Sequence, residues 1–125
     1  MEVTPLRIIE SLAASATSQC GPVNLTDAKY LIVTCRVTYN ASATLPIRVN
    51  LKYSPDGNNY DTVAFTYFEP DLTAGSTVQE SKLFGATKTG YMIVEVVNQD
   101  TTYAATIIKV WASVAEHEEP LPGRP

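Results

Sequence analysis

The chain has 125 residues, a formal net charge of −4 and a pI of about 4.8. Its length predicts one domain with a sizeable core. Only 18% of its residues are charged, against about 25% in ordinary globular proteins, so we expect part of the surface to be covered in the working state. The nine Lys and Arg residues are scattered singly, which argues against binding to nucleic acid or to an anionic membrane. No apolar run approaches the roughly eighteen residues of a membrane-spanning helix.

Residues 1–14 are predicted to form an N-terminal arm or an edge strand. Apolar Leu6 and Ile8 are interrupted by charged residues, which does not fit a signal peptide. We therefore expect the protein to be made in the cytoplasm without a leader. The following segment, residues 15–28, is rich in turn-forming residues and predicts a loop, with a short strand around Val23 and Leu25.

The stretch from residue 46 to residue 68 predicts a strand, a turn and a second strand. Its first strand has apolar residues at odd positions, and its even positions carry the polar residues Arg48, Asn50 and Lys52. This period of two is typical of a strand with one dry and one wet face. The sequence SPDGNN then predicts a turn, because Pro fixes φ, Asp can bond its own backbone and Gly permits positive φ. The second strand is predicted at residues 60–68.

Other strands are predicted at residues 29–39, 77–84, 91–97 and 103–114, with polar turns between them. The strand at 77–84 is mostly polar and is expected at a sheet edge. In the last strand one face is predicted to carry Ala104, Thr106, Ile108, Val110, Ala112 and Val114, and the other Ile107 and Trp111. Seven or eight strands with turns about every eight to twelve residues predict an all-β fold, an antiparallel β-sandwich or jelly roll over residues 15–115.

The sequence contains two cysteines and an unusual C-terminal segment. Cys35 shares the apolar phase of its strand, which is typical of a buried reduced thiol. A disulfide with Cys20 stays open, because the sequence does not give the separation of the two Cα atoms. Residues 116–125 contain three Glu and three Pro, and they predict an extended, flexible acidic tail.

The residue pattern gives no sign of an enzyme. The single histidine, His117, falls in the predicted tail, which cannot hold a general base at hydrogen-bond distance. Asp56, Asn58 and Asp61 offer oxygen ligands around one turn, but they lack the spacing of a calcium loop. The chain also has no CxxC, HExxH or GxSxG motif. We therefore expect no catalytic residue, cofactor or metal.

Aromatic side chains are the strongest candidates for a binding surface. Four of them fall in the strand predicted at residues 60–68, whose two faces cannot both lie in the core of a sandwich. The exposed rings could pair on the sheet surface, contact a partner protein or form a carbohydrate platform. The residues predicted to form an interface are Leu6, Ile8, Tyr60, Phe65, Tyr67, Phe68 and Trp111.

Four segments in a fixed order resemble the small virion proteins of tailed phages. They are VNLTDAKYLIVTCRVTYN, PIRVNLKYSPDGNNYDTV, TGYMIVEVVN and ATIIKVWASV, and the resemblance covers residues 23–114. It implies a non-enzymatic β-sandwich that decorates or cements a capsid, or lies at the neck or tail, as a symmetric oligomer. The implied partner is the major capsid protein or another virion protein, and the implied location is the virion. A three-fold oligomer is the form we expect, with the arm and the tail each able to dock on a neighbour.

The sequence leaves a second function open. The piece SPDG also recurs in discoidin-type and other carbohydrate-binding sandwiches. A virion protein predicts an oligomer with a broad, flat contact surface. A carbohydrate-binding or receptor-recognition module predicts exposed, coplanar aromatic rings with polar neighbours.

Overall fold

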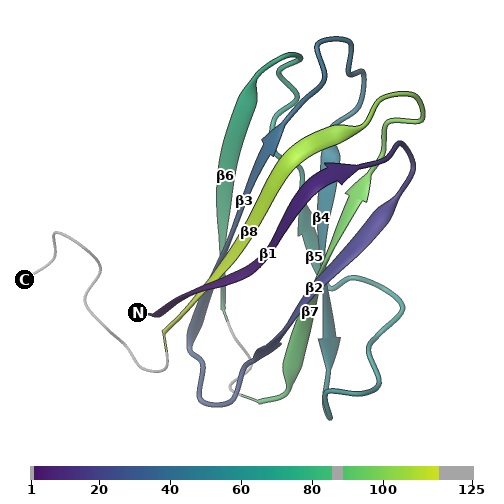
Figure 1. Ribbon diagram of the computed structural model, residues 1–125. Helices are drawn as coiled ribbons and strands as arrows, with labels where there is room; N and C mark the ends of the chain where they lie inside the picture. The colour runs from purple at the N-terminus through teal and green to yellow at the C-terminus, as the bar shows by residue number, and fades with distance from the viewer. Residues whose placement is uncertain (1, 86–88, 116–125) are drawn as a thin grey trace, which may run out of the picture.

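The computed structural model describes residues 2–85 and 89–115, which form two packed β-sheets (Figure 1). The predicted fold class, an all-β antiparallel sandwich, is confirmed. Within these ranges no helix could cross a membrane. The strands are β1 (Glu2–Leu12), β2 (Thr17–Asn24), β3 (Tyr30–Thr38), β4 (Ile47–Ser54), β5 (Thr66–Phe68), β6 (Thr77–Gly85), β7 (Tyr91–Asn98) and β8 (Ala105–Ala115).

Each sheet has four strands. Sheet A has the order β1-β8-β3-β6, and sheet B has the order β2-β7-β4-β5. The mostly polar strand β6 lies at an edge of sheet A, as predicted. At the opposite edge, β1 pairs with β8 from Glu2 to Leu12, and its Ile9 is buried. The N-terminal segment is therefore an edge strand of the sheet, one of the two alternatives that the sequence predicted. The predicted tail at residues 116–125, with His117, lies outside the described residues.

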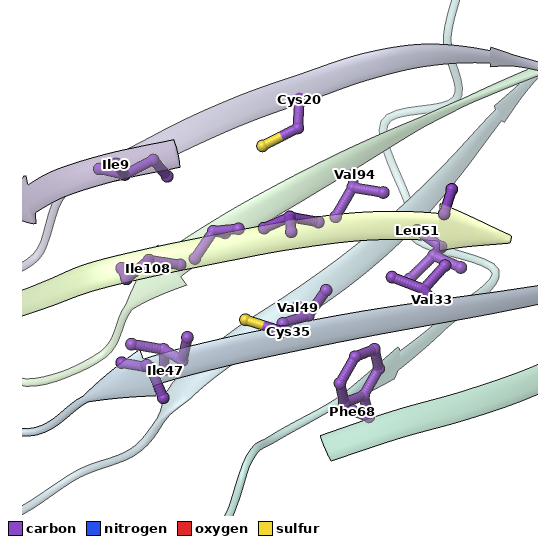
Figure 2. Close-up of a cluster of buried hydrophobic side chains, with 14 of the residues drawn as sticks. Ile9, Cys20, Val33, Cys35, Ile47, Val49, Leu51, Phe68, Val94 and Ile108 are labelled. Atoms are coloured by element: carbon purple, nitrogen blue, oxygen red, sulfur yellow. The ribbon is translucent and has the colours of Figure 1, made fainter. Parts of the chain in front are cut away.

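The core lies between the sheets, where alternate residues of facing strands meet (Figure 2). In β3 the predicted inward positions are all buried, among them Val33 and Cys35. They face Val49 and Leu51 of β4 and Val94 of β7. Burying a side chain of this size stabilises the fold by about 1.5–3 kcal/mol. The same alternation leaves Arg48, Asn50 and Lys52 of β4 partly exposed on the outer face of sheet B.

Two segments differ from the sequence prediction. The loop predicted at residues 15–28 contains the eight-residue strand β2. Its turn-forming residues Gly21 and Pro22 occupy an irregularity in the pairing with β7, so Cys20 and Val23 on either side both reach the core. Conversely, the strand predicted at residues 60–68 shortens to β5, because this edge segment has only β4 as a partner.

The last strand contains a bulge that the sequence pattern does not reveal. Ile107 has a φ of 49°, and the pairing of β8 with β3 shifts register at this point. A bulge inserts one residue and reverses the phase of the alternation. Ala105 therefore faces the core, and the prediction for Ala104 and Thr106 is wrong. Beyond the bulge the alternation from Ile108 to Ala112 is as predicted.

The two cysteines are free and buried on opposite sheets, Cys20 on β2 and Cys35 on β3. Both side chains lie among the apolar core residues (Figure 2). Burial raises the pKa of the Cys35 thiol to about 12. The predicted buried, reduced thiol at Cys35 is confirmed.

Candidate functional site

The outer face of sheet B carries a row of side chains that crosses all four strands. Gln19 of β2 lies opposite Glu95 of β7. Asn50 of β4 lies opposite Glu95 on one side and Tyr67 of β5 on the other. Side chains opposite one another on one face of a sheet are roughly 5 Å apart at Cβ. The four residues Gln19, Glu95, Asn50 and Tyr67 therefore form one continuous surface, which we call the polar row.

Hydrogen bonds hold the carboxylate of the polar row in place. Oε2 of Glu95 accepts a bond from Nζ of Lys52 at 3.2 Å and one from Nε2 of Gln19 at 3.4 Å. The side chains of Lys52 and Glu95 are 19% and 14% exposed, so this ion pair is partly shielded from water. A ligand on this face would meet acceptors and donors that are already oriented.

At the β5 end of the polar row, Tyr67 presents an aromatic ring that is fixed by its neighbours. The residue is 46% exposed. The guanidinium of Arg48 lies 3.9 Å from the ring centre, within cation–π range. Nε of Arg48 donates to Oε2 of Glu69 at 3.3 Å, and Nε2 of Gln99 donates to the same oxygen at 2.6 Å. The result is an anchored ring beside several polar groups.

The turn at residues 54–59 uses its carboxylate for structure. Oδ1 of Asp56 accepts the backbone N–H groups of Asn58 at 2.9 Å and Asn59 at 2.8 Å, and the hydroxyl of Ser54 at 3.0 Å. The amide of Asn59 donates to Oδ2 at 2.7 Å. These bonds hold the pKa of the Asp56 carboxyl well below its usual range. In the described part of the chain, no group of three or more His, Cys, Asp or Glu side chains could hold a metal.

The structure distributes the seven predicted interface residues over separate places. Tyr67 belongs to the polar row, and Phe65 lines a pocket at the open edge of the sandwich. Phe68 is buried, so its placement in an interface is wrong, because it is the residue of β5 that faces inward. Tyr60 and Leu6 are half-buried, in the β4–β5 connection and in β1. Ile8 and Trp111 lie on sheet A, and Ile8 is exposed.

Sequence reasoning missed most members of the polar row. The alternation in β4 did place Arg48, Asn50 and Lys52 on a wet face, but it could not show what lies beside them. Gln19 and Glu95 are not among the residues predicted to form an interface. The missing information is the pairing between strands, because Gln19 and Glu95 are 76 positions apart.

Comparison with known proteins identifies the fold class. No protein-family model matches the sequence, and no curated protein matches it. Among solved structures, the chain is similar to the CBM36-1 domain of a multidomain xylanase from the hindgut metagenome of Trinervitermes trinervoides. The identity is 14%, the match covers 91% of this chain and 98% of that domain, and the TM-score is 0.50. This similarity establishes an antiparallel β-sandwich of the type seen in that carbohydrate-binding module.

Two further structures match with lower scores. One is described as Family 16 Carbohydrate Binding Module-2, with 14% identity over 84% of this chain and 72% of that chain, and a TM-score of 0.46. The other is a family GH115 4-O-methyl-α-glucuronidase, BtGH115A, with specificity for decorated arabinogalactans. Its identity is 7%, the match covers 89% of this chain and 16% of that chain, and the TM-score is 0.47.

Proposed function

We propose that this protein is a non-catalytic carbohydrate-binding β-sandwich and that the polar row binds the glycan. The observation that carries the proposal is the exposed ring of Tyr67 in line with Asn50 and with the hydrogen-bonded carboxylate of Glu95. A sugar has apolar C–H faces that stack on an aromatic ring and hydroxyl groups that both donate and accept hydrogen bonds. An amide, a carboxylate and an ammonium group together serve both kinds of hydroxyl bond. The similarity in fold to a CBM36 domain supports the same ligand class.

The dimensions and charge of the face narrow the ligand class. With neighbouring strands about 4.8 Å apart, a row across four strands is about 14 Å long, which suits a short oligosaccharide better than a single sugar. The charged groups on this face occur as two pairs, Lys52 with Glu95 and Arg48 with Glu69. Since the charges in each pair compensate, a neutral glycan fits this face better than a polyanion.

The test is a binding screen of the purified protein against neutral oligosaccharides, followed by calorimetric titration of any glycan that binds. Replacing the anchored ring by Tyr67→Ala should weaken binding by about ten-fold or more, the scale of a central aromatic contact. Asn50→Ala should also weaken binding. Asn58→Ala removes an amide from the exposed turn at residues 54–59 and should leave binding unchanged. Absence of binding to every neutral glycan, or full affinity in Tyr67→Ala, would refute the proposal.

A second candidate function is subunit contact in a phage particle, as a capsid decoration protein or a neck or tail component. The observation that favours it is the outer face of sheet A, where Ile8, Leu83 and Ile107 are exposed. Leu83 lies opposite Ile32 on this face, and Trp111 lies opposite Thr34. Exposed apolar side chains on three strands of one sheet offer contact area to a protein partner.

Light scattering behind a sizing column tests this second proposal. We expect a three-fold oligomer of the wild-type chain that Leu83→Ser converts to a monomer without loss of folding. A monomer at every concentration, together with no binding to capsids, would reject it.

A further inference from the structure

A pocket of about 310 Å³ opens where the free edges of the two sheets meet. It lies between the end of β6 and the segment that connects β4 to β5. Aliphatic Leu25 and Leu31 line it together with three aromatic residues and one acidic residue, Tyr53, Phe65, Phe84 and Asp61. It is distinct from the polar row, because none of the row residues lines it.

The three rings of the pocket are held by identified contacts. Phe65 and Phe84 meet edge to face, with ring centres 6.5 Å apart and planes at 79°. The backbone N–H of Phe65 donates to O of Leu51 at 3.0 Å, which fixes Phe65 although it lies outside β5. The hydroxyl of Tyr53 donates to the backbone oxygen of Thr89 at 3.3 Å. The rings therefore form a preformed aromatic wall, and Phe65 is 52% exposed at its mouth.

Asp61 supplies the only carboxylate among the lining residues. Its backbone N–H donates to the backbone oxygen of Tyr53 at 2.9 Å, and the residue is exposed to solvent. Among the described contacts, no cation or hydrogen-bond donor pairs with the carboxylate of Asp61. The nearby ammonium of Lys82 donates instead to O of Tyr67 at 3.2 Å, and it lies 5.7 Å from the ring centre of Phe84.

The combination of rings and one carboxylate selects for a positively charged ligand with apolar bulk. Aromatic faces carry negative electrostatic potential and attract organic cations. A neutral apolar ligand would displace water from the carboxylate without replacing its interactions, which costs free energy. We infer that this pocket binds a small organic cation of the quaternary-ammonium type, such as a trimethylammonium group.

Calorimetric titration with choline tests the inference, and 3,3-dimethylbutan-1-ol serves as the neutral ligand of the same shape. We expect choline to bind at least about five-fold more tightly than the neutral alcohol, the effect of a cation–π contact and a facing carboxylate. Equal binding of the two ligands, or no binding of choline at tens of millimolar, would overturn the inference. Phosphocholine is titrated in parallel. If phosphocholine binds more tightly than choline, the natural ligand is a phosphorylated form of the cation. If phosphocholine binds more weakly, the natural ligand is the free cation. Both results presuppose that choline itself binds.

Three variants separate the chemical contributions. Phe65→Leu keeps the apolar bulk and removes an aromatic face, and Asp61→Asn removes the charge with little change of shape. Each should weaken choline binding by about five-fold or more, whereas Asp71→Asn, the same change in the loop between β5 and β6, should not. Full affinity in Asp61→Asn would contradict the inference. Tyr67→Ala should leave choline binding intact, and Phe65→Leu should leave glycan binding intact, so failure at one site is distinguishable from failure at the other.

Discussion

Asn98 joins two strands and a connecting loop at one end of the sandwich, and replacing it by Asp should be strongly destabilising. The residue is 2% exposed. Its amide nitrogen donates to the backbone oxygens of Leu12 at 3.1 Å, Ala13 at 3.3 Å and Tyr103 at 3.0 Å. Its amide oxygen accepts the backbone N–H of Asp100 at 3.2 Å. The side chain thus ties the end of β1 and the β7–β8 connection to the end of β7.

Asn98→Asp keeps the shape and turns the donor into a second acceptor that faces three carbonyl oxygens. The two N–H donors that serve these three oxygens are lost, at about 0.5–1.5 kcal/mol for each hydrogen bond, and the new charge is buried without a partner. We therefore expect a loss of about 3–5 kcal/mol at pH 7. Since small domains have total stabilities of about 5–15 kcal/mol, this loss is a large share. The new carboxyl should have a raised pKa. The deficit should therefore be largest above this raised pKa and should narrow as the pH falls toward the pKa of an exposed Asp, where the protonated acid donates again.

Urea unfolding, followed by circular dichroism and by the fluorescence of the single tryptophan, measures this loss. Asn24→Asp is the matched control, because the exposed Asn24 only accepts a bond, from the backbone N–H of Thr26 at 2.9 Å, and an Asp can accept it too. The control should cost less than about 0.5 kcal/mol. A loss below about 1 kcal/mol in Asn98→Asp, or a deficit that does not narrow at low pH, would refute the reasoning.

Four further predictions concern stability and thiol reactivity. Gly90→Ala should destabilise the fold by about 2 kcal/mol or more, because φ is 85° and a Cβ would lie 2.7 Å from a backbone oxygen. The control Gly85→Ala has open space around its Cβ and should be near neutral, and thermal unfolding measures both variants. Tyr39→Phe removes a hydroxyl that donates to one backbone oxygen at 2.6 Å and accepts one backbone N–H at 3.2 Å, and should cost about 1–3 kcal/mol in urea. Burial raises the pKa of Tyr39 to about 12, so wild-type stability should fall between about pH 10 and 12 and the variant should lack that part of the decline. Backbone N–H donors hold the pKa of Asp100 well below its usual range, so Asp100→Asn should be less stable than the wild type at neutral pH. The difference in stability between the two should narrow as the pH falls below the ordinary range of Asp, and equal stability at pH 7 would contradict the role of these bonds. Iodoacetamide at pH 8 should leave Cys35 unmodified until urea unfolds the chain, as mass spectrometry would show, and rapid labelling of the folded protein would contradict its burial.

The sequence by itself determined the fold class and the faces of its regular strands. The alternation of apolar and polar residues in β3, β4 and β7 is local, because successive side chains of a strand point to opposite faces whatever the partner. The turn at residues 54–59 was also readable, since its Ser, Pro, Asp and Gly act within a few positions of one another.

Only the tertiary structure decided which exposed residues become neighbours. Pairing between distant strands brings Gln19 beside Glu95 and Asn50 beside Tyr67, and it forms the pocket from β6 and the β4–β5 connection. Irregularities in that pairing, such as the bulge at Ile107, change which side chains face the core, so the local alternation predicts the wrong face for Ala104 and Thr106. Strand order and register depend on the packing of the whole core, so a binding surface that crosses several strands has no signature in any one segment.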